Sequence, residues 1–146
     1  PAATLSRFWT MVAHYHGQVL NVAELARALG GSEPTARRYL DILSGTYVVR
    51  QLPPWFENLK KRQVRAPKVY VRDPGILHAL LGVPDAVSLM SHPKLGASWE
   101  GFCLEQILSL CGDRAAWFWA THGGAELDLL LFHAGGRLGI EFKFSE

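Results

Sequence analysis

The stretch AELDLLLFHAGGRLGIEFKFSE (residues 125–146) decides how the second half of this chain folds. Two apolar runs flank a double glycine at 135–136, which predicts a β-hairpin with a two-residue turn of the kind that matches strand twist. With both glycines in the turn, Asp128 lies directly opposite Lys143 and diagonal to Glu141. The charges that interrupt this apolar hairpin are therefore expected to lie together.

Side chains alternate between the two faces of a strand, so this register also sorts the hairpin into two faces. One face is apolar and forms the core. The other face carries Glu126, Asp128, Glu141 and Lys143, together with Leu130 and Phe132.

Two carboxylates beside an ammonium group indicate a metal-dependent catalytic site. Asp128 and Glu141 are oxygen ligands of the kind that Mg²⁺ prefers, and Lys143 is placed to orient an attacking water. The pattern indicates metal-assisted phosphodiester hydrolysis. The alternative is a surface salt-bridge cluster, in which each cross-strand pair contributes only about 0.2–1 kcal/mol.

A helix predicted at 97–111 adds a further carboxylate. Glu100 shares one helical face with apolar residues, and a buried lone charge is costly unless it is paired or functional. If this face packs on the hairpin, Glu100 could reach Asp128. Alternatively, Glu100 is a first-turn carboxylate that the helix dipole favours.

The first half of the chain has a different pattern. Apolar spacing predicts helices at 4–16, after Asn21 and after Ser32, where Asn21 and Ser32 are N-caps. Two strand-like segments follow, TYVVRQLPPWF (46–56) and APKVYVRD (66–73). Three helices and a two-stranded ribbon with a basic tip are the layout of a winged helix, whose third helix can enter a DNA groove.

Charge is distributed unevenly along the chain. Residues 1–74 hold 11 Lys and Arg against 5 Asp and Glu, whereas residues 75–146 hold 4 against 8. A basic first half favours a nucleic-acid partner, although a solvated or protein-binding face is the alternative. The residues predicted to contact nucleic acid are Thr35, Arg37, Arg38, Lys60, Lys61, Arg62 and Arg65.

A predicted loop from Val83 to Pro93, punctuated by prolines, separates two predicted domains, 1–82 and 83–146, in an α+β fold. No apolar run approaches the ~18 residues that would span a bilayer, and no signal peptide is evident. The two cysteines, Cys103 and Cys111, are expected to stay reduced, which predicts a cytoplasmic location. The six histidines show no zinc-ligand spacing. Because the sequence opens at Pro1, we expect it to be a fragment.

At Glu100, Asp128 and the run Glu141-Phe142-Lys143, the sequence resembles the PD-(D/E)XK nuclease superfamily. That resemblance implies that these four charged residues are catalytic and that Asp128 and Glu141 bind Mg²⁺. The expected structure is a partial restriction-endonuclease-like domain, a helix followed by a three-stranded antiparallel meander.

A more specific resemblance covers nearly all of the chain. The segments LARALGGSEPTARRYLDILSGTYVVRQLPPW, KRQVRAPKVYVRDPGILHALLG, LGASWEGFCLEQI, FWATHGGAELDLLL and GIEFKFSE resemble the C-terminal domain of unknown function attached to prokaryotic AAA+ type ATPases. This implies a P-loop ATPase domain elsewhere in the full-length protein. No G-x-x-x-x-G-K-[ST] occurs, so no ATP site is expected in this segment.

The sequence departs from the family at two points. Ala120 stands where an Arg tends to follow the Phe-Trp pair, and the nuclease-like core normally continues beyond the third strand. A half-covered apolar face makes a homo-oligomer an expected alternative. The lead hypothesis is therefore a nucleic-acid-binding accessory module of an AAA+ ATPase with a nuclease-like site. The alternative is a non-catalytic interaction or regulatory domain on the same scaffold.

Overall fold

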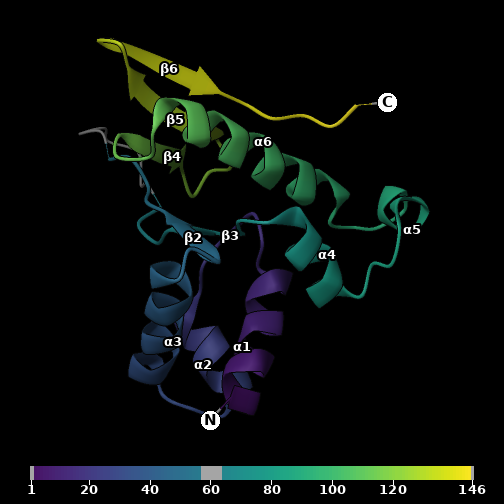
Figure 1. Cartoon of the computed structure of the whole chain (residues 1–146). Helices are drawn as coiled ribbons and strands as arrows, with labels where there is room; N and C mark the ends of the chain where they lie inside the picture. Colours follow the sequence, from purple (N-terminus) through teal and green to yellow (C-terminus); the bar gives the residue numbers. More distant parts are fainter. Residues whose placement is uncertain (1, 57–63, 146) are drawn as a thin grey trace.

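The first half of the chain consists of three helices and a small sheet (Figure 1). The computed structural model describes residues 2–56 and 64–145. The helices are α1 (Ala2–His14), α2 (Val22–Leu29) and α3 (Glu33–Gly45). Both predicted N-caps are confirmed: Asn21 Oδ1 accepts the amide of Glu24 at 3.1 Å, and Ser32 Oγ accepts that of Thr35 at 3.4 Å.

The first sheet has three antiparallel strands in the order β1-β3-β2. They are β1 (Gln18–Val19), β2 (Val49–Leu52) and β3 (Lys68–Val71), of which the two-residue β1 was not predicted. The three helices pack beside this sheet around a common apolar core. That core includes Phe8, Val12, Leu25, Leu40, Val49 and Val69.

The second half begins with α4 (Pro74–Leu81), α5 (Ala86–Met90) and α6 (Leu95–Cys111). The second sheet follows, with the antiparallel strands β4 (Ala116–Ala120), β5 (Glu126–His133) and β6 (Gly136–Ile140) in chain order. In Figure 1, α6 and this sheet lie together above the first half of the molecule. The described chain is thus α+β, with a helix followed by the expected three-stranded meander.

The predicted register of the final hairpin is wrong by two residues. The turn consists of Ala134 and Gly135, with φ of 50° and 78°, and His133 pairs with Gly136. A shift of two by itself preserves the predicted faces, but β5 is irregular where it pairs with β4. Residues 128–131 of β5 are all buried, and Leu138 of the predicted core face is exposed. In the observed register a Cβ on Gly139 would lie 3.2 Å from the Leu127 side chain, a tight contact that glycine avoids.

The last strand is also shorter than predicted, because it ends at Ile140. Beyond it, the Phe142 amide donates to Oδ2 of Asp128 at 2.8 Å. A buried carboxylate thus replaces the backbone partner that a longer ladder would have supplied.

The two halves share one apolar cluster. Leu52 and Tyr70 of the first sheet pack with Leu104 of α6 and with Phe118 and Leu129 of the second sheet. The chain near β2 also runs beside β4, where the Trp55 amide donates to the Phe118 carbonyl at 2.6 Å. Residues on both sides of the predicted boundary at 82/83 therefore contribute to one core. Within 2–56 and 64–145, no helix is long and apolar enough to cross a membrane.

Candidate functional site

A buried lysine lies at the centre of the charged residues that join the two halves. Lys68, on β3, is only 3% exposed. Its Nζ lies 3.2 Å from Oε1 of Glu100 on α6 and 3.6 Å from Oδ1 of Asp128 on β5, and it also pairs with Glu126. Strand β3 is thus tied to α6 and β5 through a single ammonium group, and we refer to Lys68, Tyr70, Glu100, Glu126 and Asp128 as the Lys68 cluster.

Tyr70 completes the Lys68 cluster. It lies two residues along β3 from Lys68, and the side chains of residues i and i+2 share a face of a strand. Its hydroxyl donates to Oε1 of Glu100 at 2.5 Å. The Phe118 ring lies beneath the ammonium, 5.7 Å from Nζ to the ring centroid. Phe118 and Tyr70 therefore shield the Lys68–Glu100 pair from water, whereas the Glu126 side chain is 45% exposed.

The protonation states in the Lys68 cluster follow from burial and charge. Burial lowers the pKa of Lys68, but Glu100, Glu126 and Asp128 outweigh it, so the pKa lies above its ordinary value and the ammonium persists. Burial raises the pKa of Glu100, and Lys68 opposes that rise. Burial, followed by the carboxylate of Glu100, raises the pKa of Tyr70, which keeps the phenol a donor.

The structure brings together two of the four residues predicted to be catalytic. Glu100 and Asp128 meet at Lys68, in agreement with the expectation that Glu100 could reach Asp128. Glu141 and Lys143 instead form an ion pair with each other at 3.1 Å, with side chains 59% and 75% exposed. The predicted pairing of Asp128 with Lys143 is wrong, because the register shift and the early end of β6 carry Lys143 into solvent.

Sequence reasoning missed Lys68 and Tyr70 and assigned Glu126 no role beyond its place on the charged face. One signal could have found Lys68. It begins a strand, Lys-Val-Tyr-Val, of which every residue is buried. A lysine in such a strand needs a buried counter-charge, and the first half of the chain offers few carboxylates.

The Lys68 cluster does not fit the Mg²⁺ ion that the resemblance implies. Mg²⁺ requires near-octahedral oxygen ligands at about 2.0–2.1 Å. Here the ammonium of Lys68 holds the point where Glu100, Glu126 and Asp128 converge, and its charge repels a cation. Among the described residues, no three His, Cys, Asp or Glu side chains are grouped so that they could hold a metal.

A buried histidine forms a second connection between the halves. His16 is 1% exposed; its Nδ1 accepts the Val71 amide, and its Nε2 donates to the Ala97 carbonyl, both at 2.9 Å. Burial lowers the pKa of His16 to about 4. A Cβ on Gly101 would lie 2.5 Å from Nε2 of His16, so α6 approaches this ring at a position that only glycine allows.

Two arginines form a third connection. Arg50 makes a forked pair with Glu105 of α6, with one bond of 3.1 Å, and reaches Asp113 at 3.0 Å. Arg72 donates through Nε to the same Glu105 at 2.9 Å. Because Glu105 is 12% exposed and shared by two guanidinium groups, its charge is fully compensated inside the protein.

The predicted nucleic-acid residues of α3 are on the surface. Thr35, Arg37 and Arg38 are all exposed, and Arg37 forms an exposed pair with Glu33 at 3.7 Å. Arg37 and Arg65, although far apart in the sequence, line one groove of about 600 Å³ beside the start of α2. Lys60, Lys61 and Arg62 lie outside the described residues.

Comparison with known proteins places the chain in a family. Residues 1–87, more than half of the chain, match a domain of unknown function, DUF8612. The chain belongs to the DUF8612 family. Residues 95–146, which carry α6 and the second sheet, match a second domain of unknown function, DUF4143. Lys68 therefore comes from the DUF8612 region, whereas Glu100, Glu126 and Asp128 come from the DUF4143 region.

Two relatives are mycobacterial. The chain is 55% identical over 143 residues to the uncharacterized proteins Rv2008c of Mycobacterium tuberculosis and Mb2031c of Mycobacterium bovis. The match covers 98% of this chain but 32% of each relative, so the chain spans about a third of their length. No solved structure matches the chain significantly.

Proposed function

We propose that this chain is a nucleic-acid-binding accessory module of a larger AAA+ type ATPase, with a winged helix in its first half and a non-catalytic, nuclease-like scaffold in its second half. The observation that carries the proposal is the groove lined by Arg37 and Arg65. It joins the exposed face of α3 to the chain entering β3, the two elements that a winged helix applies to a duplex.

The order of elements supports the winged-helix interpretation. Helix α1, strand β1, helices α2 and α3 and strands β2 and β3 follow one another in the order of that fold. The exposed Thr35, Arg37 and Arg38 suit a helix that contacts phosphate and base edges. Arg65, at the end of the β2–β3 connection, suits a phosphate contact beside it.

The Lys68 cluster favours a scaffold over a nuclease. An active site of this type requires its carboxylates to be open to a metal and its lysine to face the substrate. Here Glu100 and Asp128 are engaged by Lys68 inside the protein, and Lys143 pairs with Glu141 at the surface. The charges of the Lys68 cluster instead connect the two halves.

Three observations support an ATPase domain in the full-length protein. The motifs along the chain resemble the C-terminal domain that accompanies AAA+ ATPases, and residues 95–146 match DUF4143. The mycobacterial relatives are about three times as long as this chain, which leaves room for an ATPase domain.

The nucleic-acid proposal is tested by replacing Arg37 and Arg38 together with alanine. If each contacts one phosphate, duplex DNA affinity should fall roughly 10-fold at 100 mM salt, and the slope of log affinity against log salt should decrease by about 2. Fluorescence anisotropy with a labelled duplex from 50 to 200 mM salt measures both quantities.

Arg114→Ala is the matched control, because it removes an exposed arginine from the second half of the molecule and should leave both quantities unchanged. Affinity that does not vary with salt, or an equal loss in the control, would reject α3 as the binding element.

The scaffold proposal makes a separate prediction. With plasmid and Mg²⁺ or Mn²⁺, the chain should produce no nicking above a protein-free control, because the Lys68 ammonium excludes a cation from the carboxylates. A gel assay detects nicked circles. Nicking that disappears in Asp128→Asn while the circular dichroism spectrum is preserved would overturn the proposal in favour of the nuclease hypothesis.

A further inference from the structure

Tyr47 follows the end of α3 in a backbone conformation that suits glycine. Its φ is +60°, in the left-handed region that bulky side chains rarely adopt. The next amide, of Val48, bonds back to the Leu43 carbonyl at 3.1 Å, which is how helices end when glycine takes this place. The tyrosine side chain is 77% exposed, so burial does not compensate for the strained backbone. Strain of this kind is common at binding sites.

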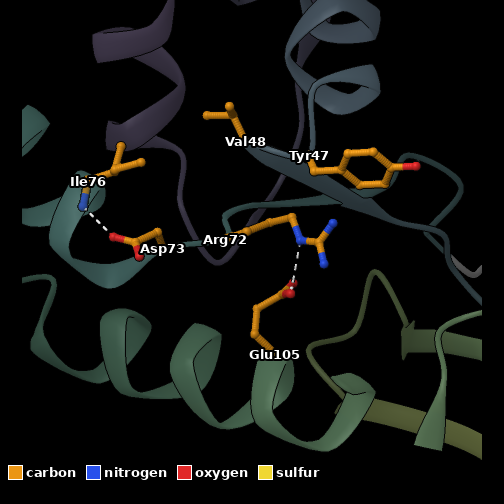
Figure 2. A pocket seen from close by; sticks show the side chains of 6 residues that line it. All are labelled: Tyr47, Val48, Arg72, Asp73, Ile76 and Glu105. Carbon is orange, nitrogen blue, oxygen red and sulfur yellow. Dashed lines mark hydrogen bonds and ion pairs between the residues drawn. The ribbon is translucent and has the colours of Figure 1, made fainter. Parts of the chain in front are cut away.

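Tyr47 forms one wall of a pocket of about 370 Å³ at the junction of the two halves (Figure 2). Val48 and Ile76 supply an apolar wall, and Arg72, Asp73 and Glu105 supply the polar groups. Asp73 caps α4, with Oδ1 accepting the Ile76 amide at 2.8 Å, and Glu105 is engaged by Arg50 and Arg72. Both carboxylates therefore already have partners.

Arg72 is the polar group of this pocket with N–H donors available for a ligand. A guanidinium carries five N–H donors, and Arg72 uses its Nε for Glu105. In the part of the chain that the structure describes, its two terminal nitrogens donate no hydrogen bond. They point away from Asp73 in Figure 2. The Tyr47 ring lies over the guanidinium, 5.7 Å from its carbon, and shields it on one side. A partly shielded pair of parallel donors is the arrangement that binds a carboxylate or phosphate through two bonds.

We propose that the Tyr47–Arg72 pocket binds a carboxylate of an acidic peptide, with Arg72 holding the oxygens through its two terminal nitrogens and Tyr47 covering the contact. Val48 and Ile76 would contact the methylene groups of the bound side chain. This is a protein-binding site at the junction of the halves, and it does not depend on whether α3 binds DNA.

Charge favours a carboxylate over a phosphate. The charges of Arg50 and Arg72 are balanced by those of Glu105 and Asp113, and Asp73 adds a further negative charge. The pocket thus has one donor fork, and its neighbourhood carries more negative than positive charge. The neighbouring carboxylates would repel a phosphate with nearly two charges about twice as strongly as a singly charged carboxylate, so the donor fork favours the carboxylate.

The proposal is tested by NMR titration of the ¹⁵N-labelled 146-residue chain. The probe is the amide of N-acetyl-glutamate, with the amide of N-acetyl-glutamine as its neutral counterpart and inorganic phosphate as the competing anion. We expect the glutamate probe to shift the Nε–H signal of Arg72 and the backbone amides of Tyr47 and Ile76 saturably, with a dissociation constant on the order of millimolar. The glutamine probe should leave these signals in place.

Two variants separate binding from folding. Arg72→Gln should weaken glutamate binding at least 5-fold, although it also removes a partner of Glu105 and could disturb the fold. Tyr47→Gly should also weaken binding several-fold, while its thermal midpoint stays at or above that of the unmodified chain because glycine relieves the positive φ. Loss of binding in a variant that is no less stable cannot be attributed to unfolding.

Three results would overturn the proposal. The first is a glutamine probe that shifts the same signals equally. The second is a Tyr47→Gly chain that binds the glutamate probe as tightly as the original. The third is saturation by phosphate or duplex DNA at a lower concentration than by the glutamate probe, which would assign the pocket to nucleic acid instead.

Discussion

Replacing Lys68 with methionine should lower the free energy of unfolding at pH 7 by about 3–5 kcal/mol, the range found when one partner of a buried ion pair is removed. Methionine preserves most of the apolar stem, so little of the loss would come from packing. The loss arises because Glu100 and Asp128 would stay buried without the ammonium that now lies 3.2 and 3.6 Å from them.

The dependence of this loss on pH distinguishes a charge effect from a packing effect. Burial already raises the pKa of Glu100 in the folded state, and without Lys68, which opposes that rise, it should lie still further above its value in the unfolded chain. The folded variant would then bind more protons than the unfolded chain as pH falls, so part of the lost stability should return between pH 7 and pH 5. Urea unfolding followed by circular dichroism at several pH values measures this.

Lys143→Met is the matched control. The Lys143 side chain is 75% exposed and pairs only with Glu141 among the described residues, so its removal should change the free energy of unfolding by less than about 0.5 kcal/mol. Equal effects of the two substitutions would contradict the assignment of Lys68 as the charge that joins the halves. A Lys68→Met loss that stays constant with pH would indicate packing instead.

Acidification should remove about 3 kcal/mol of stability through His16 alone. Burial holds its pKa in the folded state at about 4, against an ordinary value of 6.5, and each unit of difference corresponds to about 1.4 kcal/mol. The sign follows from proton uptake: between pH 6.5 and 4 the unfolded chain binds a proton at this ring and the folded chain does not. The contribution is therefore complete above pH 6.5 and is lost as pH falls to about 4.

Protonation of His16 would remove one identified hydrogen bond and add charge beside other basic groups. A proton on Nδ1 would break the bond from the Val71 amide, and the nearby Lys94 and His78 add further positive charge. In His16→Gln, the decline in stability between pH 6.5 and 4.5 should become shallower by roughly 2–3 kcal/mol. His133→Gln, at an exposed position, should retain the original decline. An unchanged decline in His16→Gln would assign the acid sensitivity to other groups.

Local signals in the sequence predicted much of the fold correctly. The three N-terminal helices and their caps at Asn21 and Ser32 depend on interactions within a few residues, and all are present. The predicted separation of the final hairpin into a core face and a charged face is correct only in part, because residues 128–131 of β5 are all buried and Leu138 of the predicted core face is exposed. The predicted register itself is wrong, because the turn consists of Ala134 and Gly135 and Gly136 already belongs to β6.

The candidate site depends on contacts between elements that are distant in the sequence. The sequence by itself determined that Glu100 lies on an inward helical face and Asp128 on the charged face of the hairpin, because both follow from the periodicity of one element. Only the tertiary structure decided which lysine meets them. Lys68 lies on a strand 32 residues before Glu100, and it reaches the two carboxylates because β3 packs against α6 and β5. A contact between distant elements leaves no periodic trace in a single sequence. The hairpin pattern therefore indicates Lys143, on the same hairpin as Asp128, and that lysine is in solvent.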